Sequence, residues 1–196
     1  MAPTAPRAVA GAGPDRPTAW TEPRTPATLL DATVRTLLIV FHSMTGGTRS
    51  MAQAAARGAA AESQVVVRLM HASDAQPADV LSADAYRLAT PENLAAMSGL
   101  MKDFFDRTYY AALERIEGRP YATLVCAGSD GRNAARQIER VCTGWRLRAA
   151  AEPLIVRTGA QTPEAIAAAK VIGADDLARC EELGATLAAG LAMGVF

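Results

Sequence analysis

The segment with the most chemical content is a loop of hydroxyls and glycines, "HSMTGGT", at residues 42–48. It follows an apolar run and precedes an alanine-rich segment, in which a helix is expected to begin at Thr48. Ser43, Thr45 and Thr48 offer hydroxyls, while Gly46 and Gly47 let the backbone turn tightly and expose its N–H groups. A helix amino terminus adds unpaired N–H groups and a positive dipole. The loop therefore predicts a site for a phosphate dianion that needs no lysine, although a plain helix-capping turn would show the same pattern.

Other phosphate-binding patterns fit the chain less well. No lysine follows the glycines, so the GxxxxGK[ST] pattern of nucleotide hydrolases is absent from the sequence. The GxGxxG pattern of dinucleotide-binding proteins is absent too. The "GAG" at residues 11–13 has no strand before it and predicts no site.

A second loop with chemical content, "TPENLAAMSG", follows a later apolar segment at residues 90–99. Pro91 is expected to fix the turn after the strand, and Ser98 to cap the next helix. A planar ligand could take hydrogen bonds from the backbone of this segment, and the candidate contacts are Thr90, Pro91, Glu92, Asn93 and Leu94. Taken alone, the segment is equally consistent with an ordinary capped loop.

A third loop, "AGSDGR", spans residues 127–132 and again combines glycines with small polar residues. Gly128 and Ser129 are candidate ligand contacts, and Asp130 is both a candidate contact and the expected cap of the following helix. A plain strand-to-helix turn is the alternative interpretation.

Alternating apolar runs and helical patterns must position these loops. Strands are predicted at 34–41, 63–70, 83–90 and 121–128, and a fifth at the end of 149–157. Helices are predicted at 48–60, from Ser98 to about Gly118, after Asp130, and from about Asp175 to Met193, with a short helical turn at Thr162 and Pro163. This alternation predicts an α/β fold: a doubly wound five-stranded parallel sheet in the order 2-1-3-4-5, with helices on both faces. The three loops would then meet where the strand order reverses.

Composition narrows the function. Half of the 196 residues are hydrophobic, and 20 basic residues balance 20 acidic ones, which argues against nucleic acid as the main partner. The three cysteines, Cys126, Cys142 and Cys180, are widely spaced and are expected to be buried thiols of a cytoplasmic protein. With only His42 and His71 as histidines, no metal site is expected.

Residues 1–30 differ from the rest of the chain. They hold six of its eleven prolines and lack the apolar core of a signal peptide. We expect a flexible tail there, in which Trp20 is either docked or bare, followed by one domain at 31–196. The chain has no apolar run long enough to predict a membrane span.

At this point the sequence resembles the flavodoxin-like superfamily. "LIVFHSMTGGTRSMAQA" is similar to the FMN-phosphate signature, S-x-T-G-x-T followed by a helix with an alanine, which falls on Ser43, Thr45, Gly46, Thr48 and Ala52. Gly47 replaces the usual asparagine. "ATPENLAAMSGLMKDFFDRTY" is similar to the flavin-contacting segment of NAD(P)H-dependent FMN reductases, quinone reductases and WrbA-like proteins, through Thr90, Pro91, Ser98, Lys102, Phe105, Asp106 and Arg107.

The resemblance implies FMN as the cofactor, held by Ser43, Thr45, Gly46, Gly47, Thr48, Thr90, Pro91, Glu92, Asn93, Leu94, Gly128, Ser129 and Asp130. The family's aromatic residue after Pro91 is missing, which predicts a flavin that is less stacked or is covered by a partner subunit. Lys102, Asp106 and Arg107 either touch the ligand or form ion pairs on the helix surface or with a loop, and the second interpretation is favoured. His42 is expected to be structural, and no side chain is expected to be catalytic.

The expected activity is that of an oxidoreductase. The resemblance implies NAD(P)H as a transient electron donor, a small acceptor such as a quinone or free flavin, and a homodimer or homotetramer. A flavodoxin-type electron carrier and a flavin-free binding module are the alternatives, and the neutral charge argues against a carrier that is steered by a charged face. Four apolar residues, Met97, Phe104, Tyr109 and Tyr110, could form a subunit interface or belong to the core.

Overall fold

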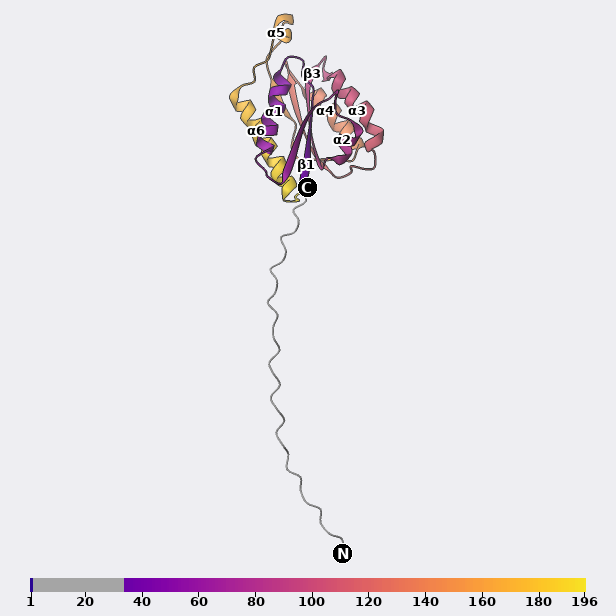
Figure 1. Ribbon diagram of the computed structural model, residues 1–196. Coiled ribbons are helices and arrows are strands. Elements are labelled where there is room, and N and C mark those ends of the chain that lie inside the picture. Colours follow the sequence, from indigo (N-terminus) through magenta and orange to yellow (C-terminus); the bar gives the residue numbers. More distant parts are fainter. Residues whose placement is uncertain (2–33) are drawn as a thin grey trace. The chain divides into compact units, whose positions relative to one another are not determined.

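The apolar runs of the sequence form one sheet (Figure 1). The computed structural model describes residue 1 and residues 34–196, so the predicted tail and Trp20 lie outside the described residues. The parallel strands are β1 (Arg35–Phe41), β2 (Val65–His71), β3 (Ala85–Asn93), β5 (Pro120–Ala127), β6 (Arg148–Ala149) and β7 (Leu154–Arg157). Their order is β2-β1-β3-β5-β6, and β7 also pairs with β5. The predicted order 2-1-3-4-5 is therefore confirmed, with β6 and β7 together occupying the fifth place.

The fifth strand lies at the end of residues 149–157, as predicted, and a separate two-residue strand, β6, precedes it. β6 pairs with the start of β5 and β7 with its end, and residues 150–153 interrupt the two. Pro153 stands directly before β7, and a proline has no N–H to donate to a strand ladder.

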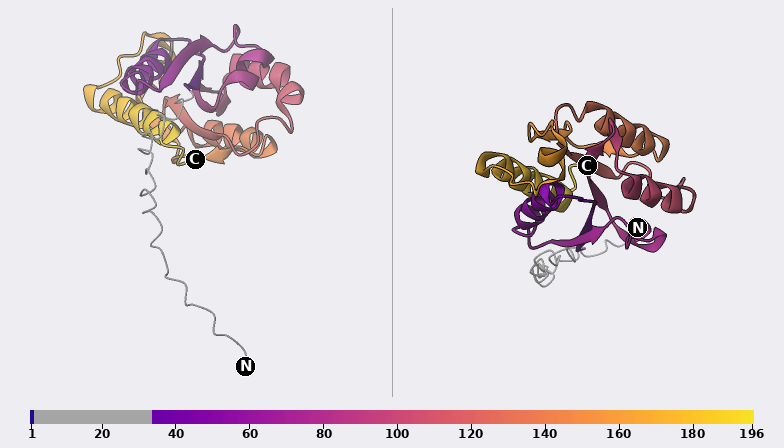
Figure 2. Two further views of the ribbon diagram at one scale, coloured as in Figure 1. Left: turned by 60° about the horizontal axis from the view of Figure 1, so that its bottom comes forward. Right: turned by 90° about the horizontal axis from the view of Figure 1, so that it is seen from above.

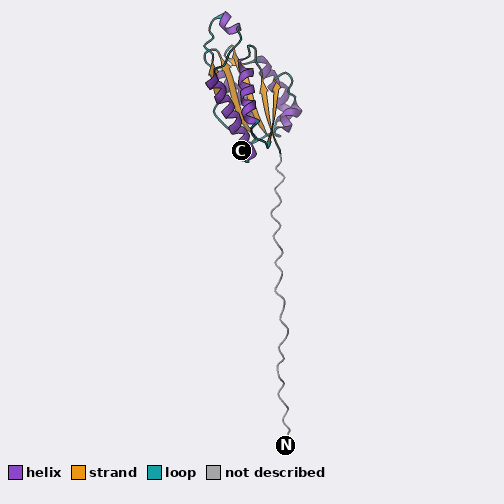
Figure 3. Cartoon of the chain, turned by 60° about the vertical axis from the view of Figure 1, so that its left-hand side comes forward, coloured by secondary structure: helices purple, strands orange, loops and turns teal. Residues whose placement is uncertain are grey.

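Residues 34–196 form six helices, of which all but α5 cover the two faces of the sheet (Figures 1 and 2). They are α1 (Gly47–Ala59), α2 (Pro77–Ser82), α3 (Gly99–Ala112), α4 (Arg132–Gly144), α5 (Pro163–Ala167) and α6 (Ala174–Ala192). Helices α1 and α6 lie on one face, and α2, α3 and α4 on the other. In Figure 3 the strands run between these two helical layers. No helix in the described part of the chain is long and apolar enough to cross a membrane.

The helix starts largely follow their predicted caps. Ser98 caps α3 by accepting a hydrogen bond from the Met101 N–H at 3.4 Å, and Thr162 caps α5 through the Ala165 N–H at 3.2 Å. Helix α3 ends at Ala112, earlier than predicted, because Leu113 has ψ 133° and leaves the helical region. Helix α2 was not predicted as a helix.

Asp130 does not cap α4, contrary to the prediction. The cap is Gly131, in the left-handed region with φ 84°, and no side chain caps this end. A Cβ on Gly131 would lie 2.5 Å from Cγ2 of Ile155, so both conformation and space require glycine. Asp130 is exposed and lies 3.7 Å from the Arg132 guanidinium.

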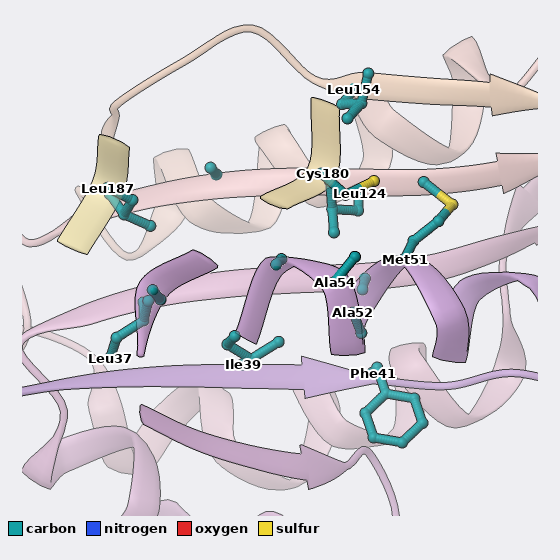
Figure 4. Packing of buried hydrophobic residues seen from close by; sticks show 14 of the residues in the cluster. Leu37, Ile39, Phe41, Met51, Ala52, Ala54, Leu124, Leu154, Cys180 and Leu187 are labelled. Atoms are coloured by element: carbon teal, nitrogen blue, oxygen red, sulfur yellow. The ribbon is translucent and has the colours of Figure 1, made fainter. Parts of the chain in front are cut away.

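The core on the α1 and α6 face is made largely of small and aliphatic residues (Figure 4). The two helices touch through their backbones: a Cβ on Gly184 would lie 2.0 Å from the Ala55 carbonyl oxygen, and one on Gly58 would lie 1.9 Å from that of Glu181. This contact fixes the position of α1, whose amino terminus faces the predicted phosphate loop.

The core on the other face is rich in aromatic residues. Trp145 stacks on Tyr109 at 5.8 Å between ring centroids and lies 5.4 Å from Phe105, which in turn contacts Phe104. Phe104 and Met97 are buried and Tyr109 is half-buried, so these three interface candidates belong to the core. Tyr110 alone among the four is exposed.

Candidate functional site

The three predicted loops meet at one pocket of about 880 Å³ at the carboxyl end of the sheet. That volume lies within the range of ordinary small-molecule sites. The predicted site residues that line it are Ser43, Thr45, Thr48, Pro91, Glu92, Asn93, Leu94, Gly128 and Ser129. Gly46, Gly47, Thr90 and Asp130 are not in the lining. Thr90 is fully buried, where its hydroxyl accepts the Ser98 N–H at 3.0 Å and helps to hold the start of α3.

The first loop leaves the amino terminus of α1 open to an anion. Gly46 is the helix cap in the left-handed region, with φ 90°, and no side chain caps this end. The Ser43 hydroxyl accepts the Gly46 N–H at 3.1 Å and so holds the turn. The first N–H groups of the helix, at Gly47, Thr48 and Arg49, have no intrahelical acceptor because of helix geometry. This arrangement suits the phosphate group that the sequence predicts.

Thr48 carries a buried hydroxyl without a partner. The residue is 1% exposed, and its Oγ1 has no hydrogen-bond partner within the described residues. A buried hydroxyl left unpaired costs about 1–3 kcal/mol. Because Thr48 also lines the pocket, a ligand oxygen would satisfy this group.

Gly47 has no room for the asparagine that the resemblance would place there. A Cβ would lie 2.7 Å from the Cys126 sulfur, 3.1 Å from Cβ of Lys170 and 3.3 Å from Cδ1 of Ile172. The departure from the signature therefore follows from close packing against the end of β5 and a segment far along the chain. The backbone N–H groups of the loop remain.

The second loop is a hairpin and not the open loop that was predicted. Strand β3 continues to Asn93, turns at Leu94 and Ala95 with φ of 49° and 59°, and pairs antiparallel with β4 (Ala96–Met97). The Met97 N–H donates to the Gln137 side chain of α4 at 2.9 Å. The turn thereby forms one edge of the pocket.

Glu92 joins this hairpin to the third loop. One carboxylate oxygen accepts the Gly131 N–H at 2.8 Å, and the other is buried without a partner within the described residues. The Asn133 amide also donates to the Ala95 carbonyl at 2.6 Å. The second and third loops therefore form one structural unit at the mouth of the pocket.

Aliphatic side chains stand at the mouth in place of the missing aromatic residue. Met44, Leu94 and Ile166 all line the pocket and are 70%, 102% and 55% exposed. They come from three different segments of the chain. Such exposed apolar groups around one opening suit the flat apolar part of a ligand.

The sequence reasoning missed one wall of the pocket, which is formed by residues 158–170 around α5. Its lining residues are Thr158, Ala160, Ile166, Ala167 and Lys170. Helix α5 itself is exposed and stands away from the rest of the domain (Figures 1 and 3). Gly128 has space only for a hydrogen here, because a Cβ would lie 2.7 Å from the Ala160 carbonyl oxygen. No motif in the segment signals this role.

The three charged residues of α3 that match the resemblance do not line the pocket. Lys102 pairs with Asp106 at 2.5 Å on the exposed side of α3. Arg107 pairs with Asp103 at 2.7 Å and donates to the carbonyls of Ala72 and Ala75 at 2.7 and 2.9 Å. Lys102 and Asp106 thus form an ion pair on the helix surface, while Arg107 pins the loop at Ala72 and Ala75, as the ion-pair interpretation predicts.

Two titratable residues flank the first loop. Burial raises the pKa of the Cys126 thiol, and Lys170 acts in the opposite direction. The Thr48 hydroxyl also acts to lower this pKa, although its contact with the sulfur does not meet hydrogen-bond geometry. Burial, and then the neighbouring His71, lower the pKa of His42. His42 lies 5.5 Å from His71 between ring centroids, and it is not among the residues that line the pocket. Neither group is therefore poised as a charged catalyst at neutral pH.

Comparisons with known proteins identify the family of the chain. A family model described as flavodoxin matches residues 39–154. The chain belongs to the flavodoxin family. A flavodoxin of Aquifex aeolicus (strain VF5) is 34% identical over 93 residues, or 47% of this chain and 48% of that protein. This chain thus spans about half the length of the curated relative that it matches.

Solved structures share the fold at lower identity. A flavodoxin from the domain Archaea has a TM-score of 0.65 at 19% identity, covering 80% of this chain and 98% of the other. A WrbA-like flavodoxin of Agrobacterium tumefaciens has a TM-score of 0.55 at 19% identity, covering 81% and 98%. At these identities the likeness concerns the fold alone.

Family membership implies an FMN cofactor, and the pocket fits one. The uncapped start of α1 and the unpartnered Thr48 hydroxyl suit the phosphate. The apolar mouth suits the isoalloxazine ring. Both parts belong to one pocket of sufficient volume.

Proposed function

We propose that the chain is a flavodoxin-type electron carrier that binds FMN in the pocket between α1, the β3–β4 hairpin and the α5 segment. The open amino terminus of α1 beside the buried, unpartnered Thr48 hydroxyl is the observation that carries the proposal. Bound FMN would supply the electron chemistry itself. The family model and the curated relative, both flavodoxins, favour this carrier over the NAD(P)H-dependent reductase that we first expected.

The chain's own residues would bind and shield the cofactor. Ser43, Thr45 and Thr48, with the N–H groups at the start of α1, would hold the phosphate. Met44, Leu94 and Ile166 would exclude water from the ring, replacing an aromatic residue with aliphatic contacts. No side chain is assigned a proton-transfer role.

The visible absorption spectrum of the purified protein, before and after addition of FMN, tests cofactor binding. A flavin spectrum that follows the protein through gel filtration is expected, and a colourless protein that ignores FMN would refute the proposal. Dithionite-reduced protein mixed with cytochrome c in a stopped-flow instrument then tests the carrier role. Rapid oxidation of the flavin is the expected result.

An NAD(P)H-dependent oxidoreductase with a small acceptor, such as a quinone or free flavin, is the second candidate. The equal numbers of acidic and basic residues favour it, because a dedicated carrier commonly uses a charged face to find its partners. Adding NADPH or NADH without oxygen separates the two candidates. Bleaching of the flavin within seconds would establish the reductase and displace the carrier.

A homodimer or homotetramer remains part of this second candidate. Of the four residues first considered for an interface, Tyr110 is the one left exposed, at 83%. Sedimentation velocity of the wild type and of Tyr110→Ser tests the interface. A wild-type dimer that dissociates in the variant is expected on this candidate, and a monomeric wild type would contradict it.

A further inference from the structure

Lys170 brings a positive charge to a phosphate loop that has no lysine of its own. Its N–H donates to the Thr45 carbonyl at 2.8 Å. Its Cβ lies 3.1 Å from the point where a Gly47 side chain would begin. Lys170 also lines the pocket, although 122 residues separate it from Thr48 in the sequence. The α5 segment therefore places a lysine directly beside the loop.

The ammonium group is held in place without an anionic partner. Its Nζ donates to the carbonyl oxygens of Ala165, Ile166 and Ala168 at 2.7, 2.9 and 2.5 Å. Within residues 34–196 no carboxylate lies within ion-pairing distance of it. Carbonyl dipoles orient an ammonium group, but they leave its net charge uncompensated. Cys126 lines the same pocket, where burial raises the pKa of its thiol and the charge of Lys170 opposes that shift.

The two charged residues of the lining lie on different parts of the pocket. Glu92 is on the hairpin, where its carboxylate accepts the Gly131 N–H. Lys170 is on the side of the phosphate loop. Lys170 thus lies on the side of the pocket to which the start of α1 directs its N–H groups, and a dianion bound there would gain from both.

We propose that Lys170 is a specificity-determining residue that makes the site select a phosphate monoester, and so FMN over riboflavin. The inference rests on the proposed function for the identity of the flavin, but the preference for a phosphate dianion concerns the loop and Lys170 alone. The sequence motif supplies N–H groups and hydroxyls, and the remote α5 segment supplies the charge.

Flavin affinities of Lys170→Met measure this preference. In this variant we expect the affinity for FMN to fall about tenfold and the affinity for riboflavin to equal that of the wild type. The reason is that one positive charge is lost near a dianion in a partly hydrated site. Lys170→Arg keeps the charge and should restore most of the FMN affinity. Lys102→Met is the matched control, because the chain has only these two lysines and Lys102 pairs with Asp106 on α3.

Three outcomes would overturn the inference. The first is unchanged FMN affinity in Lys170→Met. The second is an equal loss for FMN and riboflavin, which would mean that Lys170 only supports the pocket wall. The third is failure of Lys170→Arg to restore binding in a protein whose melting temperature matches the wild type. Failure of the wild type itself to bind FMN would instead refute the proposed function.

Inorganic phosphate tests the site without any flavin. Reductive ¹³C-methylation labels the two lysine side chains and the chain's amino terminus while keeping their charge, and the spectrum of Lys170→Arg assigns the Lys170 signal. Titration with phosphate should shift the Lys170 signal and leave that of Lys102 in place. Equal shifts of both signals, or none, would show that no anion site exists at Lys170.

Discussion

The two faces of the sheet hold their helices by opposite means. On one face, α1 and α6 touch backbone to backbone, because glycines stand where they cross. On the other face, Trp145, Phe104 and Phe105 fill a much larger space between the sheet and its helices. The first arrangement tolerates no added atom, whereas the second is sensitive to lost volume. The backbone contact between α1 and α6 also positions the start of α1, where the binding site lies. The site is therefore supported by the packing that can adjust least.

The largest effect is expected for Trp145→Ala on the aromatic face. Trp145 is 1% exposed and its indole N–H donates to the Tyr109 carbonyl at 3.0 Å. Loss of this side chain should lower the free energy of unfolding by about 3–5 kcal/mol, measured by urea denaturation. Tyr110→Ala, at an exposed position on the same face, should change little. The FMN affinity of folded Trp145→Ala should equal that of the wild type. A large loss of affinity would show that the two faces of the sheet are not independent.

Gly184→Ala tests the close-packed face. The new Cβ would lie 2.0 Å from the Ala55 carbonyl oxygen, so α6 must move away from α1. We expect a loss of about 2–3 kcal/mol in the free energy of unfolding, together with weaker FMN binding because α1 is displaced. Gly99→Ala is the control, since nothing lies within 4 Å of its added Cβ. Equal behaviour of the two variants would contradict the backbone contact.

Thr48→Val should separate stability from binding. Removing a buried hydroxyl that has no partner should raise the free energy of unfolding by about 1 kcal/mol in the ligand-free protein. FMN affinity should fall about tenfold, because the phosphate loses one donor. Thr143→Val is the matched control, because the Thr143 hydroxyl donates to the Glu139 carbonyl at 2.8 Å at an exposed position of α4. A variant that is both less stable and unchanged in FMN affinity would remove Thr48 from the site.

The smallest effect concerns pH and His42. Its pKa is lowered in the folded protein, first by burial and then by His71. The folded chain therefore binds this proton less readily than the unfolded chain, and stability falls as the pH drops through about 6.5. The expected loss between pH 7.5 and 5.5 is less than about 1 kcal/mol and should be reduced in His42→Gln. A wild type that gains stability at pH 5.5 relative to His42→Gln would reverse the assignment.

The sequence predicts the strands well because parallel strands that are buried on both faces have continuous apolar runs in their sequences. It also predicts the strand order and Ser98 as a helix cap. The hairpin at Leu94 and Ala95 was missed, since residues of this kind rarely adopt positive φ and the glycine or asparagine typical of such turns is absent. The sequence predicts Asp130, and not Gly131, as the cap of α4, because helix starts are more commonly capped by a side chain.

The candidate site was predicted only in part, for a similar reason. Nine predicted residues line the pocket, all from loops that directly follow strands. Lys170 and Ile166 come from a segment without a motif, and their contacts depend on the path of the chain after β7. Thr90 has a hydroxyl and lies at the end of a strand, as a ligand contact would. Its side chain is nevertheless buried outside the pocket, because the pleat of the strand sets the face on which each side chain lies.

The broken outer strand has a consequence for behaviour at high concentration. An uninterrupted strand at the border of a sheet offers a row of free N–H and C=O groups to which another chain can add. Here that border is divided into β6 and β7, of two and four residues, with Pro153 between them. Neither piece is long enough to template a neighbour. The interruption thereby protects this border against the edge-to-edge growth that leads to fibres.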